Sequence, residues 1–136
     1  MPDTRFTLAA VHLPCRDMEL MTGFYRDVLG LERGPDQIPI GDGPLDPWVT
    51  FQTGDVYLVL KARGWFDGEE KPVETASVHI AFRVAHRDVV DAEYERLRAT
   101  GIEFRSAPKD WPWNERACFF PDPEGNLVEI FASSNA

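Results

Sequence analysis

Apolar residues in the first half of the chain gather in short runs with the length and composition of strands. Residues 6–15 are rich in strand formers, and two further apolar runs cover 48–53 and 56–62. The two residues between the latter runs, Gly54 and Asp55, are typical of a tight hairpin turn. The pattern therefore predicts one strand followed, after an interval, by a hairpin.

The interval begins with a helical pattern. Asp17 stands where a helix N-cap is expected, and Gly30 stands where a left-handed residue often ends a helix. Residues 34–47 are rich in Gly, Pro and Asp, which predicts a loop before the hairpin. The apolar stripe of the predicted helix consists of Met21, Phe24, Tyr25, Val28 and Leu29, which recur at helical spacing.

The second half repeats this order of elements. Asp88 is the predicted cap of a second helix and Gly101 is its predicted end, matching Asp17 and Gly30. The apolar stripe of this helix consists of Val90, Tyr94 and Leu97. Strands are predicted at 78–84, 102–104, 116–120 and 127–132. In the same alignment of the two halves, Val59 matches Glu129. Internal repetition of this length points to two copies of one structural unit.

Two βαβββ modules, at 6–62 and 76–132, are therefore expected within one domain that spans 1–136. The polar stretch 63–75 is interpreted as a solvated linker between the modules. With one helix on one sheet face of each module, the fold class is α+β. The other sheet faces are expected to form a curved mixed sheet around a concave cavity, which suits a ligand.

A few polar side chains fall on strand positions that should face this cavity. Because side chains alternate along a strand, His79 and Arg83 share the face away from the helix, as does Glu129 in the last strand. The same alternation places His12 and Tyr57 of the first module toward the cavity. An imidazole or a carboxylate buried on an apolar strand is costly without a partner. These groups are therefore candidate functional residues.

Three interpretations of these polar groups remain open. One or two imidazoles and a carboxylate suit a divalent ion such as Zn, Ni, Mn or Fe, with His12, His79 and Glu129 as ligands. Alternatively, His79 and Glu129 hydrogen-bond to each other. In the third interpretation, Glu129 pairs with Arg83 on the same surface. Residue types do not decide among the three, because the spacing between strands is set by the fold.

The acidity of the chain narrows its partners. Its 136 residues carry a net charge of −9 at pH 7, and its isoelectric point is near 4.7. Nucleic acids and anionic membranes reward positive surface, so neither is an expected partner. An acidic surface would attract a cationic small molecule, although it is also common among ordinary soluble proteins.

Cysteine content and apolar run lengths indicate the compartment. Cys15 and Cys118 are the two cysteines, too few for a disulfide framework, and Cys15 on an apolar strand is expected to be a buried free thiol. No apolar run has the length needed to cross a bilayer. Residues 1–5 lack the basic start and apolar core of a secretory signal. A reducing cytoplasm is the expected location.

Two stretches in each half resemble one known superfamily. In the first half these are 9–18 (AAVHLPCRDM) and 23–31 (GFYRDVLGL), and in the second half they are 79–84 (HIAFRV) and 122–129 (DPEGNLVE). They resemble the vicinal-oxygen-chelate superfamily, which includes glyoxalase I, extradiol dioxygenases, fosfomycin-resistance enzymes and bleomycin-resistance proteins. The resemblance covers residues 6–132 and implies the tandem fold, but one fold hosts many functions.

The resemblance also implies metal ligands on the first and last strands of the modules. Two of them carry over to this chain, at His79 and Glu129. The first-strand ligand of the first module falls on Ala10, and the optional carboxylate falls on Val59. His12, two residues along the same strand face, would replace the missing ligand only after a shift of about 6–7 Å along the strand.

Bleomycin-resistance members imply a different use of the cavity. They hold a cationic drug, without a catalytic metal, in an acidic groove lined by aromatic residues in a dimer. Residues 110–116 resemble a Pro-Trp-Gly turn of many members, with Asn114 in place of Gly. The tryptophans of this chain are Trp48, Trp65, Trp111 and Trp113. A ligand-binding rim is favoured for Trp111 and Trp113, with a packed loop cover as the alternative.

Two functions follow. The first, which the sequence favours, is a glyoxalase/bleomycin-resistance-like homodimer that binds a small molecule through Trp48, Trp111, Trp113, Tyr57 and Arg83. The second is a metal-dependent enzyme of lyase, dioxygenase or transferase type. In the enzyme, His79 and Glu129 are ligands, and His12 is either the third ligand or a general base. The sequence does not identify the ligand or the catalytic residues.

Overall fold

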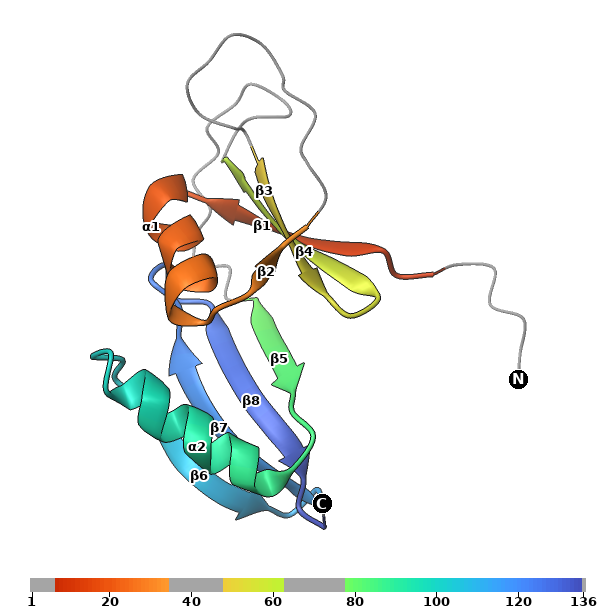
Figure 1. Ribbon diagram of the computed structural model, residues 1–136, viewed down its shortest axis with the longest axis vertical. Coiled ribbons are helices and arrows are strands. Elements are labelled where there is room, and N and C mark those ends of the chain that lie inside the picture. Colours follow the sequence, from red (N-terminus) through yellow and green to blue (C-terminus); the bar gives the residue numbers. More distant parts are fainter. Residues whose placement is uncertain (1–6, 35–47, 63–77, 136) are drawn as a thin grey trace, which may run out of the picture. The chain divides into compact units, whose positions relative to one another are not determined.

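The computed structural model describes residues 7–34, 48–62 and 78–135. The chain divides into two compact units, Met1–Pro72 and Val73–Ala136. Each unit contains one four-stranded mixed sheet, and its elements follow the order βαβββ (Figure 1). The α+β fold of two tandem βαβββ modules is therefore confirmed. The predicted linker at 63–75 lies outside the described residues.

The first unit places its strands in the order β1-β4-β3-β2. Strand β1 is parallel to β4, and the other pairs are antiparallel. The predicted strands at 48–53 and 56–62 are confirmed, whereas the first strand begins at Ala10 and β2 was not predicted. The elements are β1 (Ala10–Cys15), α1 (Met18–Gly23), the π-helix η1 (Phe24–Val28), β2 (Glu32–Arg33), β3 (Trp48–Thr53) and β4 (Val56–Ala62).

Local chemistry explains where the helical segment of the first unit begins and ends. The Asp17 side chain accepts a hydrogen bond from the backbone N–H of Leu20 at 2.9 Å, which confirms the predicted cap. Gly30 has a φ of +75°, a left-handed conformation that glycine adopts without strain. The buried side chains of this segment are Met21, Phe24 and Tyr25, three of the five predicted stripe positions.

The second unit repeats the arrangement with the strand order β5-β8-β7-β6. Strand β5 is parallel to β8, and the remaining pairs are antiparallel. Helix α2 lies across one face of this sheet (Figure 1). The elements are β5 (His79–Arg83), α2 (Arg87–Arg98), β6 (Ser106–Trp111), β7 (Glu115–Pro121) and β8 (Leu127–Ser133).

Two sequence-based assignments in the second unit are wrong. The N-cap of α2 is His86, and Asp88 lies in the first turn, where a carboxylate is favoured by the helix dipole. Residues 102–104 are not a strand. Phe104 instead packs between Tyr94 and Phe120, with ring centres 4.7 and 5.0 Å away. Its apolar character therefore serves packing rather than strand pairing.

Strand β6 occupies a segment in which the sequence pattern predicts no strand. It contains Pro108, which cannot donate a ladder hydrogen bond. The strand tolerates the proline because it lies at the sheet edge, where its pairing with β7 shifts register between Ser106 and Lys109. The end of the second helix was predicted correctly, since Gly101 has a φ of +98°.

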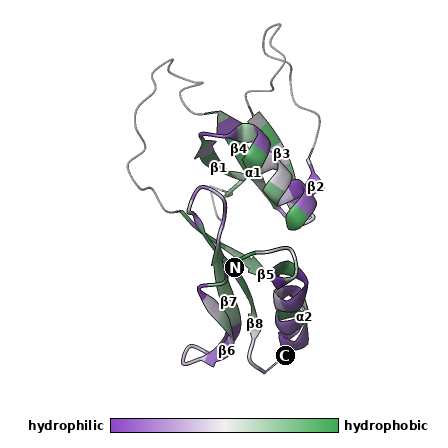
Figure 2. Ribbon diagram, turned by 90° about the vertical axis from the view of Figure 1, so that its left-hand side faces the viewer, coloured by the Kyte–Doolittle hydropathy of each residue, from purple (hydrophilic) through white to green (hydrophobic). Residues whose placement is uncertain are grey.

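The core of the second unit lies between α2 and the sheet. Arg116 on β7 bonds to Asp91 on α2, so Arg116 and every second residue along β7 face the helix. In Figure 2, β7 and β8 are mainly green, whereas α2 carries both purple and green segments. The fully buried apolar residues of this layer are Val90, Leu97, Cys118, Phe120, Val128 and Ala132, with Ile130 nearly so.

Both cysteines are buried free thiols. This confirms the expectation for Cys15, which lies on β1 and is 1 % exposed. Burial raises the pKa of the Cys118 thiol to about 12. A thiol with such a pKa stays protonated at neutral pH, so Cys118 is a packing residue rather than a nucleophile. No described helix combines the length and the apolar character needed to cross a membrane.

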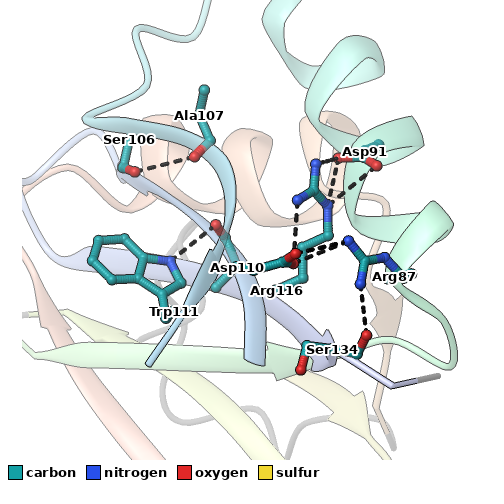
Figure 3. A network of polar contacts seen from close by, with 9 residues as sticks. Arg87, Asp91, Ser106, Ala107, Asp110, Trp111, Arg116 and Ser134 are labelled. Carbon is teal, nitrogen blue, oxygen red and sulfur yellow. Dashed lines mark hydrogen bonds and ion pairs between the residues drawn. The ribbon is translucent and has the colours of Figure 1, made fainter. Parts of the chain in front are cut away.

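A charged network joins α2 to the β6–β7 edge of the sheet. Arg87 and Arg116 converge on Asp110 in Figure 3, with nitrogen–oxygen distances of 3.0 and 3.3 Å. Arg116 also binds Asp91 at 2.8 Å, and Arg87 donates to the Ser134 carbonyl at 2.6 Å. Hydrogen bonding to Arg87, followed by that to Arg116, holds the pKa of Asp110 below its usual value.

This network predicts a loss of stability in acid. A carboxyl group whose pKa is lower in the folded state stabilises the fold above its unfolded pKa and loses that contribution as the pH falls through the folded value. Asp110→Asn is therefore expected to be less stable than the wild type at pH 6, with a difference that shrinks below about pH 4. Urea unfolding at a series of pH values measures this difference.

Glu103→Gln is the control, because Glu103 is exposed and precedes β6 without an ion pair among the described residues. Its difference from the wild type should be small over the same pH range. A stability difference for Asp110→Asn that does not change with pH would contradict the role given to the Asp110 carboxylate.

Candidate functional site

The candidate site lies on the sheet face of the second unit that points away from α2. Ala117 and Phe119 alternate with the helix-facing residues of β7, and register places Phe131 and Glu129 of β8 beside them. We call this surface the candidate face. Its residues are His79, Ala81 and Arg83 of β5, Leu127, Glu129 and Phe131 of β8, Glu115, Ala117 and Phe119 of β7, and Lys109 and Trp111 of β6.

His79 and Glu129 form the polar centre of the candidate face. Nε2 of His79 lies 2.8 Å from Oε1 of Glu129, across the parallel pair β5–β8. The Glu129 side chain is 9 % exposed, whereas that of His79 is 51 % exposed. Burial raises the pKa of Glu129, and the hydrogen bond from His79 opposes this effect. The hydrogen bond between His79 and Glu129, one of the interpretations open from the sequence, is therefore present in the structure.

Arg83 contacts Phe131 rather than Glu129, the partner that the third interpretation of the sequence gives it. Its Cζ lies 6.0 Å from the centre of the Phe131 ring, directly across the β5–β8 pair. Among residues 7–34, 48–62 and 78–135, Arg83 forms no ion pair with Glu129 or with another carboxylate. The proposed Glu129–Arg83 pair is therefore wrong for this structure.

Aromatic rings continue from the polar centre to the edge of the sheet. The Phe119 ring lies 6.0 Å from the His79 ring and 5.7 Å from the Trp111 ring, the latter at a right-angled tilt of 87°. Trp111 stacks on Trp113, with 4.9 Å between centres and 16° between planes. We call Trp113, Trp111, Phe119 and His79 the ring series. Nζ of Lys109 lies 3.6 Å from the centre of Trp111.

The β6–β7 turn fixes the position of the two tryptophans. Nε1 of Trp111, which is labelled in Figure 3, donates to the Ala117 carbonyl at 3.3 Å. This hydrogen bond holds the indole across the hairpin. Asn114 has a φ of +64°, and its N–H donates to the Trp111 carbonyl at 3.1 Å. Asparagine is one of the few side chains that tolerate this conformation. Asn114 can therefore occupy the position that Gly holds in the Pro-Trp-Gly turn that residues 110–116 resemble.

Sequence reasoning missed Phe119 and Lys109. Phe119 lies in an unbroken apolar run with Ala117, Cys118 and Phe120, so periodicity could not separate it from the core. Lys109 was missed because the sequence pattern predicts no strand at residues 106–111. Its alternation with Trp111, two residues along β6, is the signal that would have revealed it.

The remaining predicted residues belong to the first unit. His12 is exposed on β1 and pairs in register with Val59 of β4, and Ala10 pairs with the half-buried Tyr57. In the second unit the same register relates Ala81 to Glu129. Register therefore makes Val59 the counterpart of Glu129, as the sequence repeat predicted. Trp48 begins β3, but its side chain and Trp65 lie outside the described residues.

Sequence comparison places the chain in a known family. Residues 7–130 match the Glyoxalase/Bleomycin resistance protein/Dioxygenase superfamily. The chain belongs to this superfamily. The uncharacterized protein YraH of Bacillus subtilis (strain 168) is 28% identical over 131 residues, which cover 91% of this chain and 96% of that protein.

Solved structures of the superfamily share the fold. A glyoxalase/bleomycin resistance protein/dioxygenase from Nocardioides is 31% identical, with a TM-score of 0.76 over 97% of this chain and 86% of that one. TnmS3, an antibiotic binding protein from Streptomyces sp. CB03234, is 26% identical, with a TM-score of 0.72 over 97% of this chain and 100% of that one. The fold of this chain is thus shared with an antibiotic binding protein.

The superfamily often uses a divalent metal, and two side chains of the candidate face are donors of the kind such a metal accepts. His79 and Glu129 supply an imidazole nitrogen and a carboxylate oxygen in contact, which suits Zn, Ni, Mn or Fe. Within the described segments, no three His, Cys, Asp or Glu side chains are grouped so as to hold a metal ion. Two donors fall short of the three protein ligands of a typical catalytic site. His12 as a third ligand stays a prediction.

Proposed function

We propose that this chain is a small-molecule-binding protein whose ligand lies on the candidate face. The observation that carries this proposal is the ring series, which leads from the exposed Trp113 to the buried carboxylate of Glu129. A wide apolar surface beside a few polar groups is the usual composition of a ligand site. The rings supply contact area, and the His79–Glu129 pair supplies hydrogen bonds that orient the ligand.

Exposure of Trp113 supports this role over a packed loop cover. Trp113 is 53% exposed, although its stacking partner Trp111 is half-buried. A large exposed aromatic next to other rings is more typical of a binding surface than of a structural contact. The similarity to an antibiotic binding protein at 26% identity supports the same class of function. Homodimer formation and a cytoplasmic location remain part of this proposal.

Removal of the Trp113 ring tests the proposal. Trp113→Ala is expected to weaken binding of aromatic ligands by about tenfold, because a base-sized ring stacked on an aromatic side chain is worth about 1–3 kcal/mol. Ligands are found by thermal-shift screening of antibiotics and other aromatic small molecules, and their dissociation constants are measured by calorimetry. Folding should be unaffected, since the ring is exposed.

Leu20→Ala is the matched control. Leu20 is 52% exposed, close to the 53% of Trp113, but it lies on α1 of the first unit. Its substitution should leave the dissociation constant unchanged. Equal effects of the two substitutions, or no ligand in the screen, would contradict binding on the candidate face.

A metal-dependent enzyme is the second candidate function. It is favoured by the contact between His79 and Glu129, two donor types that a metal ion accepts. In this proposal His12 is the third ligand or a general base, and Tyr57 hydrogen-bonds the substrate. A bound divalent ion would act as a Lewis acid toward substrate oxygens. The residues of this chain would supply its ligands and the apolar wall beside it.

Metal analysis of purified protein separates the two functions. Stoichiometric Zn, Ni, Mn or Fe that is lost in Glu129→Gln but kept in Glu115→Gln would favour the enzyme. Glu115 is the suitable control because its carboxylate lies on the candidate face but does not contact His79. Failure to retain any of these metals after reconstitution would exclude the second candidate.

A further inference from the structure

Two basic side chains on the candidate face lie over aromatic rings. Arg83 lies over Phe131, with 6.0 Å from Cζ to the ring centre, and Lys109 lies over Trp111, with 3.6 Å from Nζ to the ring centre. In the part of the chain that the structure describes, neither cation forms an ion pair with a carboxylate. Both cations therefore keep N–H donors that a ligand could use.

Basic residues on the α2 side are arranged differently. Arg87 shares Asp110 with Arg116, which also binds Asp91 (Figure 3). The chain has 23 acidic residues against 14 Lys and Arg, so carboxylates are not scarce. A shortage of acidic groups therefore does not explain why Arg83 and Lys109 have no carboxylate partner among the described residues.

Strand register places the two cations at the ends of one row. Arg83 pairs with Phe131, Phe131 with Ala117, and Ala117 with Lys109. The row crosses four strands, so its ends are about 14 Å apart at three strand spacings of about 4.8 Å. Phe131 and Ala117 occupy the middle of this row, and the Trp111 ring lies against the Lys109 end. A flat molecule lying along this row would contact both rings and meet a cation at either end.

Carboxylates on the candidate face decide which end suits an anion. Glu129 already accepts a hydrogen bond from His79, which reduces the repulsion between the Glu129 carboxylate and an anionic ligand. Glu115 pairs in register with Trp111 and is therefore close to the Lys109 end. The Arg83 end lies on β5, separated from Glu115 by β8. Arg83 is thus the cation on this face with less competition from neighbouring acids.

We propose that the ligand class of the candidate face is an aromatic carboxylate, whose anionic group binds Arg83 and whose ring lies along the ring series. This inference rests on the proposed function. A guanidinium that no carboxylate occupies keeps its N–H edge available, and that edge matches a carboxylate in a bidentate pair. The assignment is opposite to the cationic ligand that net charge alone suggests.

The distance between a charged group and the ligand determines how strongly that group affects binding. At about 0.15 M ionic strength the Debye length is about 8 Å, so acidic groups farther away are largely screened. A carboxylate in contact with Arg83 is within hydrogen-bonding distance and is screened much less. The local cation, rather than the net charge of −9, should therefore set the preference of the site at this ionic strength.

Three compounds with the same flat group and different charges test the inference. Cinnamate, cinnamamide and cinnamylamine are anionic, neutral and cationic at pH 7, and calorimetry gives their dissociation constants. Cinnamate should bind wild-type protein about tenfold more tightly than cinnamamide, as expected of one charge-assisted hydrogen-bonded pair. Arg83→Gln should abolish this preference, and Arg83→Lys should keep part of it, because the charge remains without the planar fork.

Arg98→Gln is the matched control. Cζ of Arg98 lies 5.9 Å from the centre of the Tyr94 ring, nearly the geometry of Arg83, but on α2. This variant should keep the full preference for cinnamate. Equal affinities for the three compounds, tighter binding of cinnamylamine, or a preference that survives Arg83→Gln would overturn the inference. The proposed function would stand in those cases, because ring binding would persist and its own test uses Trp113→Ala.

Discussion

Asp122→Ala is expected to lower the free energy of unfolding by about 3 kcal/mol, because it removes several charge-assisted hydrogen bonds from a buried turn. Asp122 is 4% exposed. Its Oδ1 accepts from the backbone N–H groups of Glu124 and Asn126, both at 2.9 Å, and its Oδ2 accepts from the Asn126 side chain at 2.8 Å. Each donor would be left buried or half-buried without this acceptor.

The same turn supports the candidate face. Oδ1 of Asn126 accepts from the backbone N–H of Val78 at 3.1 Å, directly before His79. Asp122 therefore orients Asn126, and Asn126 holds the start of β5 against the start of β8. Loss of Asp122 should loosen the strand pair that carries His79 and Glu129. The DPEGN segment, part of a stretch that resembles the superfamily, thus supports the candidate face through the backbone.

Urea denaturation of Asp122→Ala and Asp88→Ala measures the effect. Asp88 is exposed in the first turn of α2 and is not its cap, so its substitution should change stability by less than about 0.5 kcal/mol. The comparison also tests the corrected cap assignment. Similar losses for both variants, or a loss below about 1 kcal/mol for Asp122→Ala, would contradict the role assigned to the turn.

Trp111→Ala is expected to lower the free energy of unfolding by about 2 kcal/mol and to remove detectable binding of aromatic ligands. Truncation of a fully buried Phe or Trp costs about 3–5 kcal/mol, and Trp111 is only half-buried. The ring contacts Trp113, Phe119 and Lys109, and its indole N–H bonds to Ala117. Its loss therefore removes the support of the exposed ring as well as its own contacts.

Trp113→Ala provides the comparison for this prediction. Both variants lose an indole from the same turn, but Trp113 is 53% exposed, so its truncation should change stability by less than about 1 kcal/mol. Urea denaturation and calorimetric titration of the two proteins separate stability from binding. A Trp111→Ala protein with wild-type stability and wild-type affinity would show that the stack is incidental to the site.

The tandem fold could be predicted because local signals and register agree in it. Gly54 and Asp55 placed the hairpin correctly, and the repeat related Val59 to Glu129 as strand pairing does. The errors occur where tertiary packing, rather than the local sequence pattern, determines the conformation of a segment. Phe104 packs against other rings from outside any strand, and β6 accepts Pro108 because it is an edge strand.

The candidate site was predicted less completely than the fold. Alternation was sufficient to place His79, Arg83 and Glu129 on one face of the second sheet. The choice of partner was not predictable, because a hydrogen bond across two strands depends on register and rotamer. Arg83 lies over Phe131, and Glu129 bonds to His79, although both pairings of Glu129 had been considered. Phe119 could not be recognised as a site residue because its neighbours in the sequence are also apolar.

Proton–nitrogen correlation NMR during ligand titration tests the central claim most directly. The titrant is the tightest binder among cinnamate, cinnamamide and cinnamylamine, and the indole signals of Trp111 and Trp113 are assigned from the two Ala variants. Saturable shifts should be largest for these two indole N–H groups and for the backbone amides of Phe119 and Glu129. Shifts confined to α2, or no saturable shifts on the candidate face, would contradict the claim that this face binds the ligand.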